Sequence, residues 1–401
     1  MSKIARQPKA HECYFDEFER AGQEAVHIMK RRFSEEEGRT FKLRHNESLS
    51  QNWAPNDLCE VTRNLFCVVN GLASKAPISY GGAMMNHLPT LLLKHVRSEG
   101  LNLGQVIYKT FMDFLDYPAL QPSMSADVCP AQVDEAKGTL IWWLSGSDTK
   151  APLLIKLALA GLDAERTGWA LVVLYSDDAE YIVEVLKKAF PPRCRYVRGT
   201  FNAISLSSLG VPQPPSYLDL NCFQFTRSYY NVSTTEHTIV AGGDDVVVRR
   251  PLMQSEYSYA ILGAPWAWCA SRGYPDWCKY GGNGGFSYRA KSFAMKYALK
   301  VDPKKNLTAW KAACGKMGAH DDGRFARSIA REIRHRGNGS LWKWAEPEVQ
   351  AEFSVETIRH SNNPCGMHKT WKYIEKGMDS TYISRLLIAP AKLLGSFGYF
   401  S

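Results

Sequence analysis

Several familiar sequence signals are missing from this chain of 401 residues. It contains neither a GxGxxG motif nor a GxxxxGK motif followed by Ser or Thr, so neither a Rossmann dinucleotide site nor a P-loop is expected. No run of about 18 apolar residues exists, which predicts no transmembrane segment. No basic run is interleaved with aromatic residues, so we do not expect nucleic acid as a partner.

The ten cysteines are scattered and form no CxxC pair. The first ten residues also lack the apolar segment of a signal peptide. Together these absences favour a cytoplasmic protein with reduced thiols. Without a secretory signal, the four Asn-x-Ser/Thr sequons are interpreted as chance matches. The sequons begin at Asn46, Asn231, Asn306 and Asn338.

The composition allows a substantial core and a phosphorylated ligand. Hydrophobic residues make up 45% of the chain, and the formal net charge is +9. This mild positive excess suits a phosphorylated ligand or an acidic surface but requires neither. We expect a mostly helical N-terminal extension over residues 1–130, a main domain over 138–375, and a tail over 376–401 that docks on the domain.

The region after residue 138 alternates between strand and helix patterns. Apolar runs predict strands at 139–144 and 169–175. Helices are expected at 153–162 and 180–190, and a short third strand at 195–197. This alternation indicates an α/β fold with a parallel sheet and right-handed crossovers.

Two adjacent carboxylates follow the next strand. Residues 219–236 look helical and lead into the apolar run 238–240, which is followed by two glycines and then Asp244 and Asp245. Because α/β sheets bind ligands at the carboxyl ends of strands, this pair could hold a divalent cation and through it a diphosphate. The alternative is an acidic turn between strands.

Three further stretches contain candidate functional residues. The glycine-rich segment 280–289 allows backbone to approach a ligand closely, or else forms a bulged hairpin. Asp321 and Asp322 form a second acidic pair, which alternatively marks a helix N-terminus. The segment 364–371 places His368 on irregular backbone, where a ligand role is plausible.

In this order the motifs resemble those of a family of largely uncharacterised proteins with a glycosyltransferase-A-like domain. The resemblance covers about residues 139–375. There are two departures: the usual Asp-x-Asp is Asp244-Asp245-Val246 here, and the acidic pair before Phe325 is Asp-Asp where Glu-Asp is more common. The matching positions are Asp244, 263–266, 282–285, Ser287, Arg289, Asp321, Asp322, Phe325, Phe353, Ser354, Glu356, Pro364, Gly366, His368, Lys369 and Trp371.

The resemblance implies a Rossmann-like mixed sheet flanked by helices, and a glycosyltransferase that moves a hexose or pentose from a nucleotide-sugar donor to a glycan or protein acceptor. Inversion at the anomeric carbon is expected, with Asp322 or Asp321 as the catalytic base. A divalent cation, Mn²⁺ or Mg²⁺, is expected on Asp244, Asp245 and His368. The residues expected to bind donor or acceptor are Gly282, Asn283, Gly284, Gly285, Arg289, Trp266, Glu356, Lys369 and Trp371.

Three other interpretations remain open from the sequence. A non-catalytic binder of nucleotide sugars or glycans would explain the missing second Asp of Asp-x-Asp. An RNA polymerase palm would explain the Gly-Asp-Asp at 243–245, with Asp219 as the additional carboxylate. A zinc site would use His360, Cys365 and His368, although no fourth ligand is evident nearby.

Overall fold

A computed structural model describes residues 129–131, 135–190, 194, 201–243, 246–266, 276–280, 282–317, 321–336, 342–356 and 363–369. The chain divides into two units, Met124–Thr370 and a unit of Met1–Ser123 with Trp371–Ser401. All described residues belong to the first unit. The predicted C-terminal tail, and the N-terminal extension up to residue 128, therefore lie outside the described residues.

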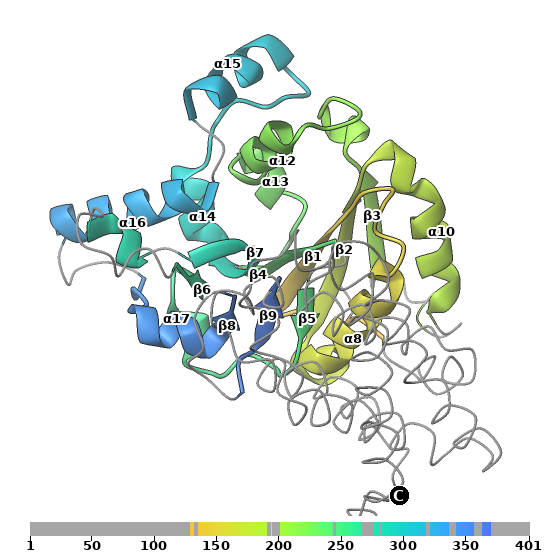
Figure 1. Cartoon of the computed structure of the whole chain (residues 1–401), viewed down its shortest axis with the longest axis horizontal. Helices are drawn as coiled ribbons and strands as arrows, with labels where there is room; N and C mark the ends of the chain where they lie inside the picture. The colour runs from red at the N-terminus through yellow and green to blue at the C-terminus, as the bar shows by residue number, and fades with distance from the viewer. Residues whose placement is uncertain are drawn as a thin grey trace, which may run out of the picture. The chain divides into compact units, whose positions relative to one another are not determined.

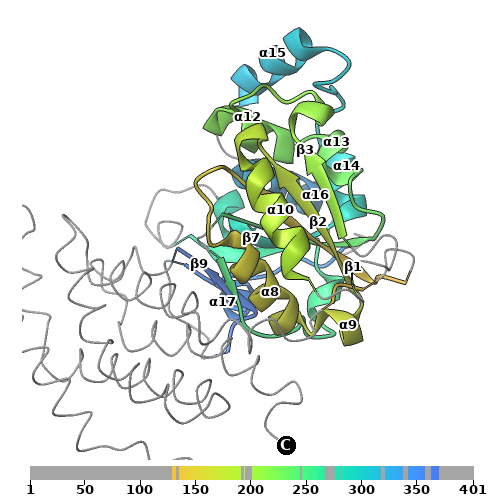
Figure 2. The same cartoon turned by 90° about the vertical axis from the view of Figure 1, so that its right-hand side faces the viewer.

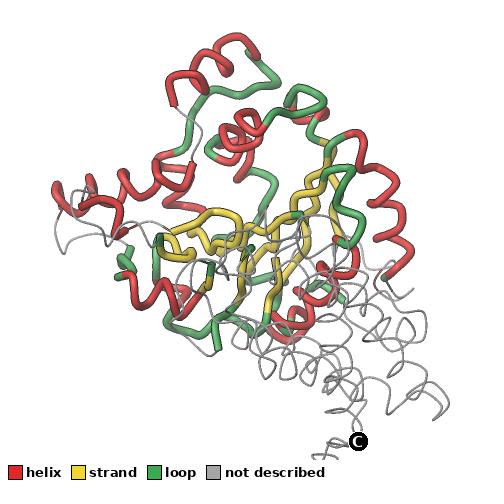
Figure 3. The backbone as a smooth tube through the Cα atoms, in the orientation of Figure 1, coloured by secondary structure: helices red, strands yellow, loops and turns green. Residues whose placement is uncertain are grey.

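A six-stranded mixed sheet forms the centre of the described unit (Figure 3). Its order is β3-β2-β1-β4-β7-β6. The first four of these strands are mutually parallel, β7 runs antiparallel to β4, and β6 runs antiparallel to β7. The strands are β1 (Gly138–Leu144), β2 (Trp169–Tyr175), β3 (Phe201–Ser205), β4 (His237–Gly242), β6 (Ile261–Pro265) and β7 (Gly282–Ala290).

A smaller sheet of three short strands lies beside the first, in the order β5-β9-β8. Its middle strand pairs antiparallel with β5 and parallel with β8. The strands are β5 (Val246–Val248), β8 (Ser354–Val355) and β9 (Gly366–His368). Chain segments on either side of β6 and β7 are thus brought together in one sheet.

Helices cover both faces of the large sheet. In Figures 1 and 2, α8 and α10 lie together on one face, whereas α12, α13, α14 and α16 lie on the other. None of the helices in the described ranges is long and apolar enough to cross a membrane. The helices are α8 (Ala151–Leu162), α9 (Ala164–Thr167), α10 (Glu180–Ala189), α12 (Tyr217–Gln224), α13 (Arg227–Tyr230), α14 (Lys291–Tyr297), α15 (Leu307–Met317), α16 (Asp321–Arg336) and α17 (Pro347–Phe353), with 3₁₀ turns η1 (Asp177–Ala179), η2 (Ser207–Leu209), η3 (Glu256–Ser258) and η5 (Asp276–Tyr280).

The apolar strand sequences explain why helices pack on both faces of the large sheet. All seven residues of β1 are buried, as expected for a parallel strand with helices on both faces. Ile141 and Trp143 pack into a core with Phe223, Tyr229 and Phe325 of the helices on one face. The intervening side chains of β1 point to the opposite face, because side chains alternate along a strand. The predicted mixed α/β sheet flanked by helices, the arrangement expected of a glycosyltransferase-A-like domain, is confirmed.

One strand was not predicted, and one predicted helix differs from the structure. The third strand is Phe201–Ser205, whereas the segment 195–197 lies outside the described residues. This strand is at the edge of the sheet and only half-buried, so its apolar pattern is weak. The predicted helical stretch 219–236 is divided into α12 and α13, because Thr226 begins a new helix by accepting a hydrogen bond from the Tyr229 amide, and residues 231–236 are not helical.

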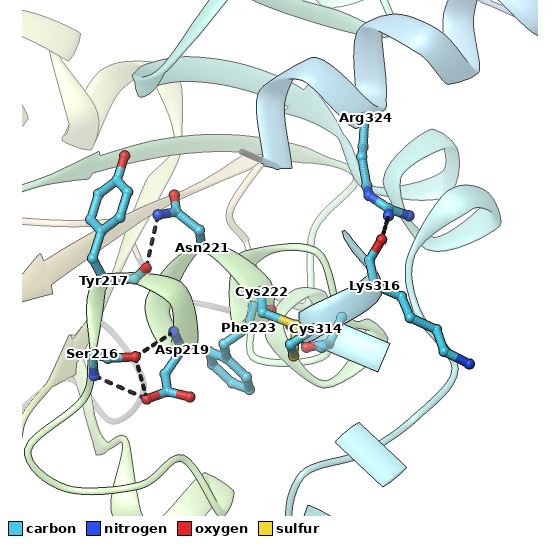
Figure 4. The surroundings of a disulfide bond; sticks show 10 residues. Ser216, Tyr217, Asp219, Asn221, Cys222, Phe223, Cys314, Lys316 and Arg324 are labelled. Atoms are coloured by element: carbon cyan, nitrogen blue, oxygen red, sulfur yellow. Dashed lines mark hydrogen bonds between the residues drawn. A yellow bond between two sulfur atoms is a disulfide. The ribbon is translucent and has the colours of Figure 1, made fainter. Parts of the chain in front are cut away.

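The prediction of reduced thiols is wrong for most of the described cysteines. Cys129 bonds to Cys194, and Cys222 of α12 bonds to Cys314 of α15 (Figure 4). Their partners lie 65 and 92 residues apart in sequence, so no short spacing reveals the pairing. Cys278 is disulfide-bonded as well. The fold decides these pairs, because it brings Cα atoms to 5.4 and 5.6 Å in the two described bonds.

Candidate functional site

The large sheet has a topological switch point between β1 and β4. The chain runs outward from β1 to β2 and β3, then returns to form β4 on the other side of β1. Parallel sheets bind ligands in the crevice outside the carboxyl ends of two such strands, because the connections there diverge to opposite faces. The backbone N–H of Gly243 donates to the Trp143 carbonyl and joins the ends of β4 and β1 at this point.

The turn after β1 contributes a carboxylate that the sequence analysis did not single out. Asp148 accepts hydrogen bonds from the backbone N–H and the hydroxyl of Ser145, at 2.6 and 2.8 Å. A Cβ placed on Gly243 would lie 3.4 Å from Asp148 Oδ1, so this carboxylate faces the turn after β4. Gly243 adopts φ +65°, a conformation that favours glycine. The only sequence feature that could have identified Asp148 is its position shortly after a fully buried strand.

Polar turns continue along the same edge beyond β1. Asp177 follows β2, and its Oδ1 accepts a hydrogen bond from the Ser207 hydroxyl, which follows β3, at 2.7 Å. The amide of Asp177 donates to Gln213 Oε1 at 3.2 Å. The carboxyl ends of four neighbouring parallel strands are therefore followed by hydroxyl, amide or carboxylate groups, which suit a polar ligand with hydroxyls.

The small sheet places His368 in β9, not on irregular backbone as the sequence predicted, and beside the residue that follows the first acidic pair. In the β5–β9 ladder, His368 pairs with Val246, the residue directly after Asp245. Asp244 and Asp245 themselves lie outside the described residues. Consecutive Cα atoms are about 3.8 Å apart, so the peptide bond to Val246 keeps Asp245 close to the start of this ladder. The register thus pairs His368 with the residue that follows Asp245, across 122 residues of sequence, the difference between 246 and 368.

Burial and a neighbouring carboxylate fix the His368 side chain. His368 and Glu356 are 7% and 4% exposed, and His368 Nδ1 lies 3.5 Å from Glu356 Oε1. The other side of the ring rests on Gly285, where an added Cβ would lie 2.3 Å from Nε2. Glu356 follows β8, while Gly285 belongs to β7, so three strands position this imidazole.

The glycine-rich segment is the first half of β7 and contains a bulge. In the ladder with β6, Gly263 pairs with Ser287 but Ala264 pairs with Asn283, so residues 284–286 are extra. Asn283 Oδ1 accepts from the Gly285 amide at 2.7 Å and closes the bulge as an Asx turn does. The bulged arrangement that the sequence left open is therefore present, and the bulge presses Gly285 against His368.

Close backbone packing explains the other glycines. A Cβ on Gly282 would lie 2.5 Å from the Gly263 carbonyl carbon, and one on Gly366 would lie 2.4 Å from the Phe286 ring. Phe286 also stacks on Phe353 of α17, with ring centroids 5.2 Å apart. The glycines thus let β6, β7 and β9 approach one another. Whether Gly282, Asn283, Gly284 or Gly285 also binds donor or acceptor remains a prediction.

Arg289 is buried at the far end of β7, with 1% of its surface exposed. Its Nε donates to Ser287 Oγ at 3.0 Å and its Nη1 to the Tyr230 hydroxyl at 2.9 Å. The guanidinium also lies over the ring of Phe325, at 5.3 Å from the centroid. Phe325 belongs to the first turns of α16, so Arg289 joins β7 to the helix that Asp321 and Asp322 open.

The remaining candidates are only partly described. Asp321 and Asp322 begin α16, as the helix-N-terminus interpretation expected, but their side chains lie outside the described residues. Trp371 lies outside as well. Trp266 directly follows β6 and is half-buried. Lys369 follows β9 with φ +52°, a conformation that non-glycine residues rarely adopt and that often marks a functional position.

The residues near His368 fit a divalent cation by their chemistry. Carboxylates suit Mg²⁺ and Mn²⁺, and a metal-binding imidazole commonly has a carboxylate at its second nitrogen. Glu356 takes that position beside His368 Nδ1. The described residues by themselves contain no group of three His, Cys, Asp or Glu side chains placed to hold a metal. A site here therefore requires Asp244 and Asp245.

Two alternatives lose support from the described residues. The polymerase interpretation needs Asp219 as a metal ligand, but Asp219 forms the capping box of α12 with Ser216 (Figure 4). The zinc interpretation needs a Cys365 thiolate. Cys365 is fully buried, its Sγ donates to the Arg250 carbonyl at 3.2 Å, and burial raises the pKa of its thiol, which disfavours the thiolate.

Part of the chain matches a known protein family. Residues 216–368 match the family described as "Protein of unknown function (DUF5672)". The matched stretch is less than half of the chain and contains the described site residues from Gly243 to His368. A search of curated protein sequences finds no match.

Comparison with solved structures finds glycosyltransferases at low similarity. The X-ray structure of the mannosyltransferase Ktr4p from S. cerevisiae is 10% identical, with a TM-score of 0.31 over 61% of this chain and 80% of that one. The same enzyme in complex with GDP gives 10% identity and a TM-score of 0.29 over the same shares.

Proposed function

We propose that this protein is a glycosyltransferase that moves a sugar from a nucleotide-sugar donor to an acceptor hydroxyl, with inversion at the anomeric carbon. One observation supports the proposal: Gly243, which precedes the acidic pair, hydrogen-bonds to Trp143 at the switch point, and Val246, which follows the pair, is paired with His368. Acidic residues at such an edge suit a diphosphate ligand that arrives with a cation.

The donor would bind along the carboxyl ends of β1 to β4. Asp148 and Asp177 are suitable acceptors for hydroxyl groups of a ribose, because a carboxylate only accepts hydrogen bonds. Lys369 would neutralise phosphate charge. Trp266 and Trp371 would pack against a sugar face, since aromatic rings offer large flat apolar surfaces.

The departing nucleoside diphosphate gains negative charge, which must be stabilised. Asp244, Asp245 and His368 would hold Mn²⁺ or Mg²⁺, and the bound cation would stabilise that charge. Glu356 would orient the His368 imidazole through Nδ1. At the start of α16, Asp322, with Asp321 as second candidate, would take the proton of the acceptor hydroxyl as general base.

A donor screen tests this proposal. The full chain is incubated with a panel of nucleotide sugars, with Mn²⁺ or with a chelator, and released nucleoside diphosphate is measured. We expect release from one donor, lost in Asp244→Asn, in Asp322→Asn and with chelator. Glu348→Gln serves as the matched control, because this exposed carboxylate lies on α17 away from the switch point. Near-normal turnover of either Asp variant would remove that residue's assigned role.

A non-catalytic binder of nucleotide sugars or glycans is the alternative function. One observation favours it: the third position of the expected Asp-x-Asp is Val246, which is fully buried in β5 and supplies no ligand. In the same screen, a donor that raises the melting temperature without nucleoside diphosphate release, with or without acceptors, would favour the binder over the transferase.

A further inference from the structure

Most cysteines of the described region form disulfide bonds, as is usual for proteins of oxidising compartments. Of the six described cysteines, Cys129, Cys194, Cys222, Cys278 and Cys314 are in disulfides, and Cys365 is free. Structural disulfides of this kind are rare in reducing compartments and common where thiols are oxidised. Each bond forms when two thiols lose two electrons and two protons to a disulfide-exchanging oxidant, which such compartments supply.

This finding removes the reason for discounting the sequons. Asn306-Leu307-Thr308 begins α15, the same helix that Cys314 ties to α12. Asn306, Leu307 and Thr308 are all exposed, and Leu307 leaves 42% of its surface open to solvent. Trp310 and Cys314 are the buried residues of this helix and hold it to the domain.

The Asn306 side chain has one atom in use and one available. Its Oδ1 accepts a hydrogen bond from the Ala309 amide at 2.9 Å and caps the helix. An N-linked glycan is attached through Nδ2, so it would leave this cap intact. The other described sequon differs, because the hydroxyl of Ser233 at Asn231-Val232-Ser233 is buried and donates to Thr139 Oγ1 at 2.8 Å.

We propose that this protein matures in an oxidising, glycosylating compartment and carries an N-linked glycan on Asn306. In that step Asn306 Nδ2 bonds to the anomeric carbon of a lipid-diphosphate-linked oligosaccharide. The bond from that carbon to the diphosphate oxygen breaks, the lipid diphosphate leaves, and the amide nitrogen loses one proton. This inference is independent of whether the protein transfers sugars itself.

The test uses the full chain isolated from the cells that naturally make it. The denatured protein is alkylated without reductant, digested and mapped by mass spectrometry, with and without an amidase that removes N-glycans and leaves Asp. We expect the amidase to convert Asn306 to Asp, with Cys222 and Cys314 protected and Cys365 alkylated. Alkylation of Cys222 and Cys314 before reduction would refute maturation in an oxidising compartment. An unmodified Asn306 would refute the proposed glycan.

Variants made in the same cells separate the sequon from the helix cap. Thr308→Ser keeps the sequon and should keep the glycan mass. Thr308→Ala destroys the sequon and leaves Asn306 as the cap, whereas Asn306→Asp destroys the sequon with an equally good capping residue. Both should lose the glycan mass while α15 stays capped. A glycan mass that is unchanged in Thr308→Ala and Asn306→Asp would place the modification elsewhere and refute the assignment.

Discussion

Replacing Gly285 with alanine should force His368 out of its observed position. The added Cβ would lie 2.3, 2.4 and 2.7 Å from the Nε2, Cε1 and Cδ2 atoms of the imidazole, well inside contact distance. His368 is buried beside Glu356, so its ring moves only by disturbing the small sheet. The φ angle of Gly285 is not in the left-handed region, so alanine causes no backbone strain there and the cost is one of packing.

Overpacking of this kind costs about 1–3 kcal/mol of unfolding free energy. For a domain of the described size, that corresponds to a melting temperature lower by roughly 2–4 °C per kcal/mol. The assay is chemical or thermal denaturation of the full chain, followed by tryptophan fluorescence and circular dichroism. Because it measures stability, the result does not depend on which reaction the protein catalyses.

Two controls isolate the contact between Gly285 and His368. Gly315 lies on α15 with nothing within 4 Å of an added Cβ, so Gly315→Ala should stabilise the protein by about 0.5–1 kcal/mol through helix propensity. In a His368→Ala background the clash is absent, so Gly285→Ala should then cost less than about 0.5 kcal/mol. An equal loss of stability with and without the imidazole would refute the proposed packing.

Three further predictions concern stability. Arg250 and Glu256 form a bidentate ion pair at 3.0 and 2.7 Å, in which Glu256 is buried and Arg250 is half-buried, so Glu256→Ala should lower the free energy of unfolding measured in urea by about 1.5–3 kcal/mol, against less than about 1 kcal/mol for a surface pair. Serine at Cys222 and Cys314 together opens a link across 92 residues and should lower the free energy of unfolding by about 2–5 kcal/mol; an unchanged melting temperature would contradict the bond. Burial lowers the pKa of His237 below its usual 6.5, so the unfolded state takes up its proton first as pH falls. Stability should therefore fall as the pH drops below about 6.5 and be unaffected by this residue at pH 8, and His237→Gln should show a smaller fall between pH 8 and pH 5.5.

Strong local patterns allowed much of the secondary structure to be predicted. The apolar run Trp169–Tyr175 became β2 at the predicted residues, and β1, α8 and α10 begin and end within two residues of the expected positions. The two strands and α8 are almost entirely buried, and α10 buries Ile182, Val183 and Leu186 at helical spacing, so their hydrophobic patterns are clear. The edge strand β3 has little burial, and its weak apolar pattern was missed for that reason.

Pairing between distant cysteines and between distant strands could not be predicted from the sequence, because no local pattern encodes it. The scattered cysteines, without any CxxC pair, suggested free thiols, yet the fold brings Cys222 of one helix to Cys314 of another. Asp148 likewise became a candidate only because β4 pairs directly with β1, which brings Gly243 close to the turn that contains Asp148. The glycine-rich segment suggested an open loop or a bulged hairpin, and only the ladder with β6 decided for the bulge.

By itself, the sequence determined the α/β class, the position of Asp244 and Asp245 after a buried strand, and His368 as a candidate partner, because strand periodicity and carboxylate chemistry are local properties. The tertiary structure alone decided that β9 pairs with β5 so that His368 faces Val246, that Glu356 and Gly285 hold the imidazole, and which cysteines are joined. These contacts depend on register and topology, which are set by the burial of the whole core and not by any one segment.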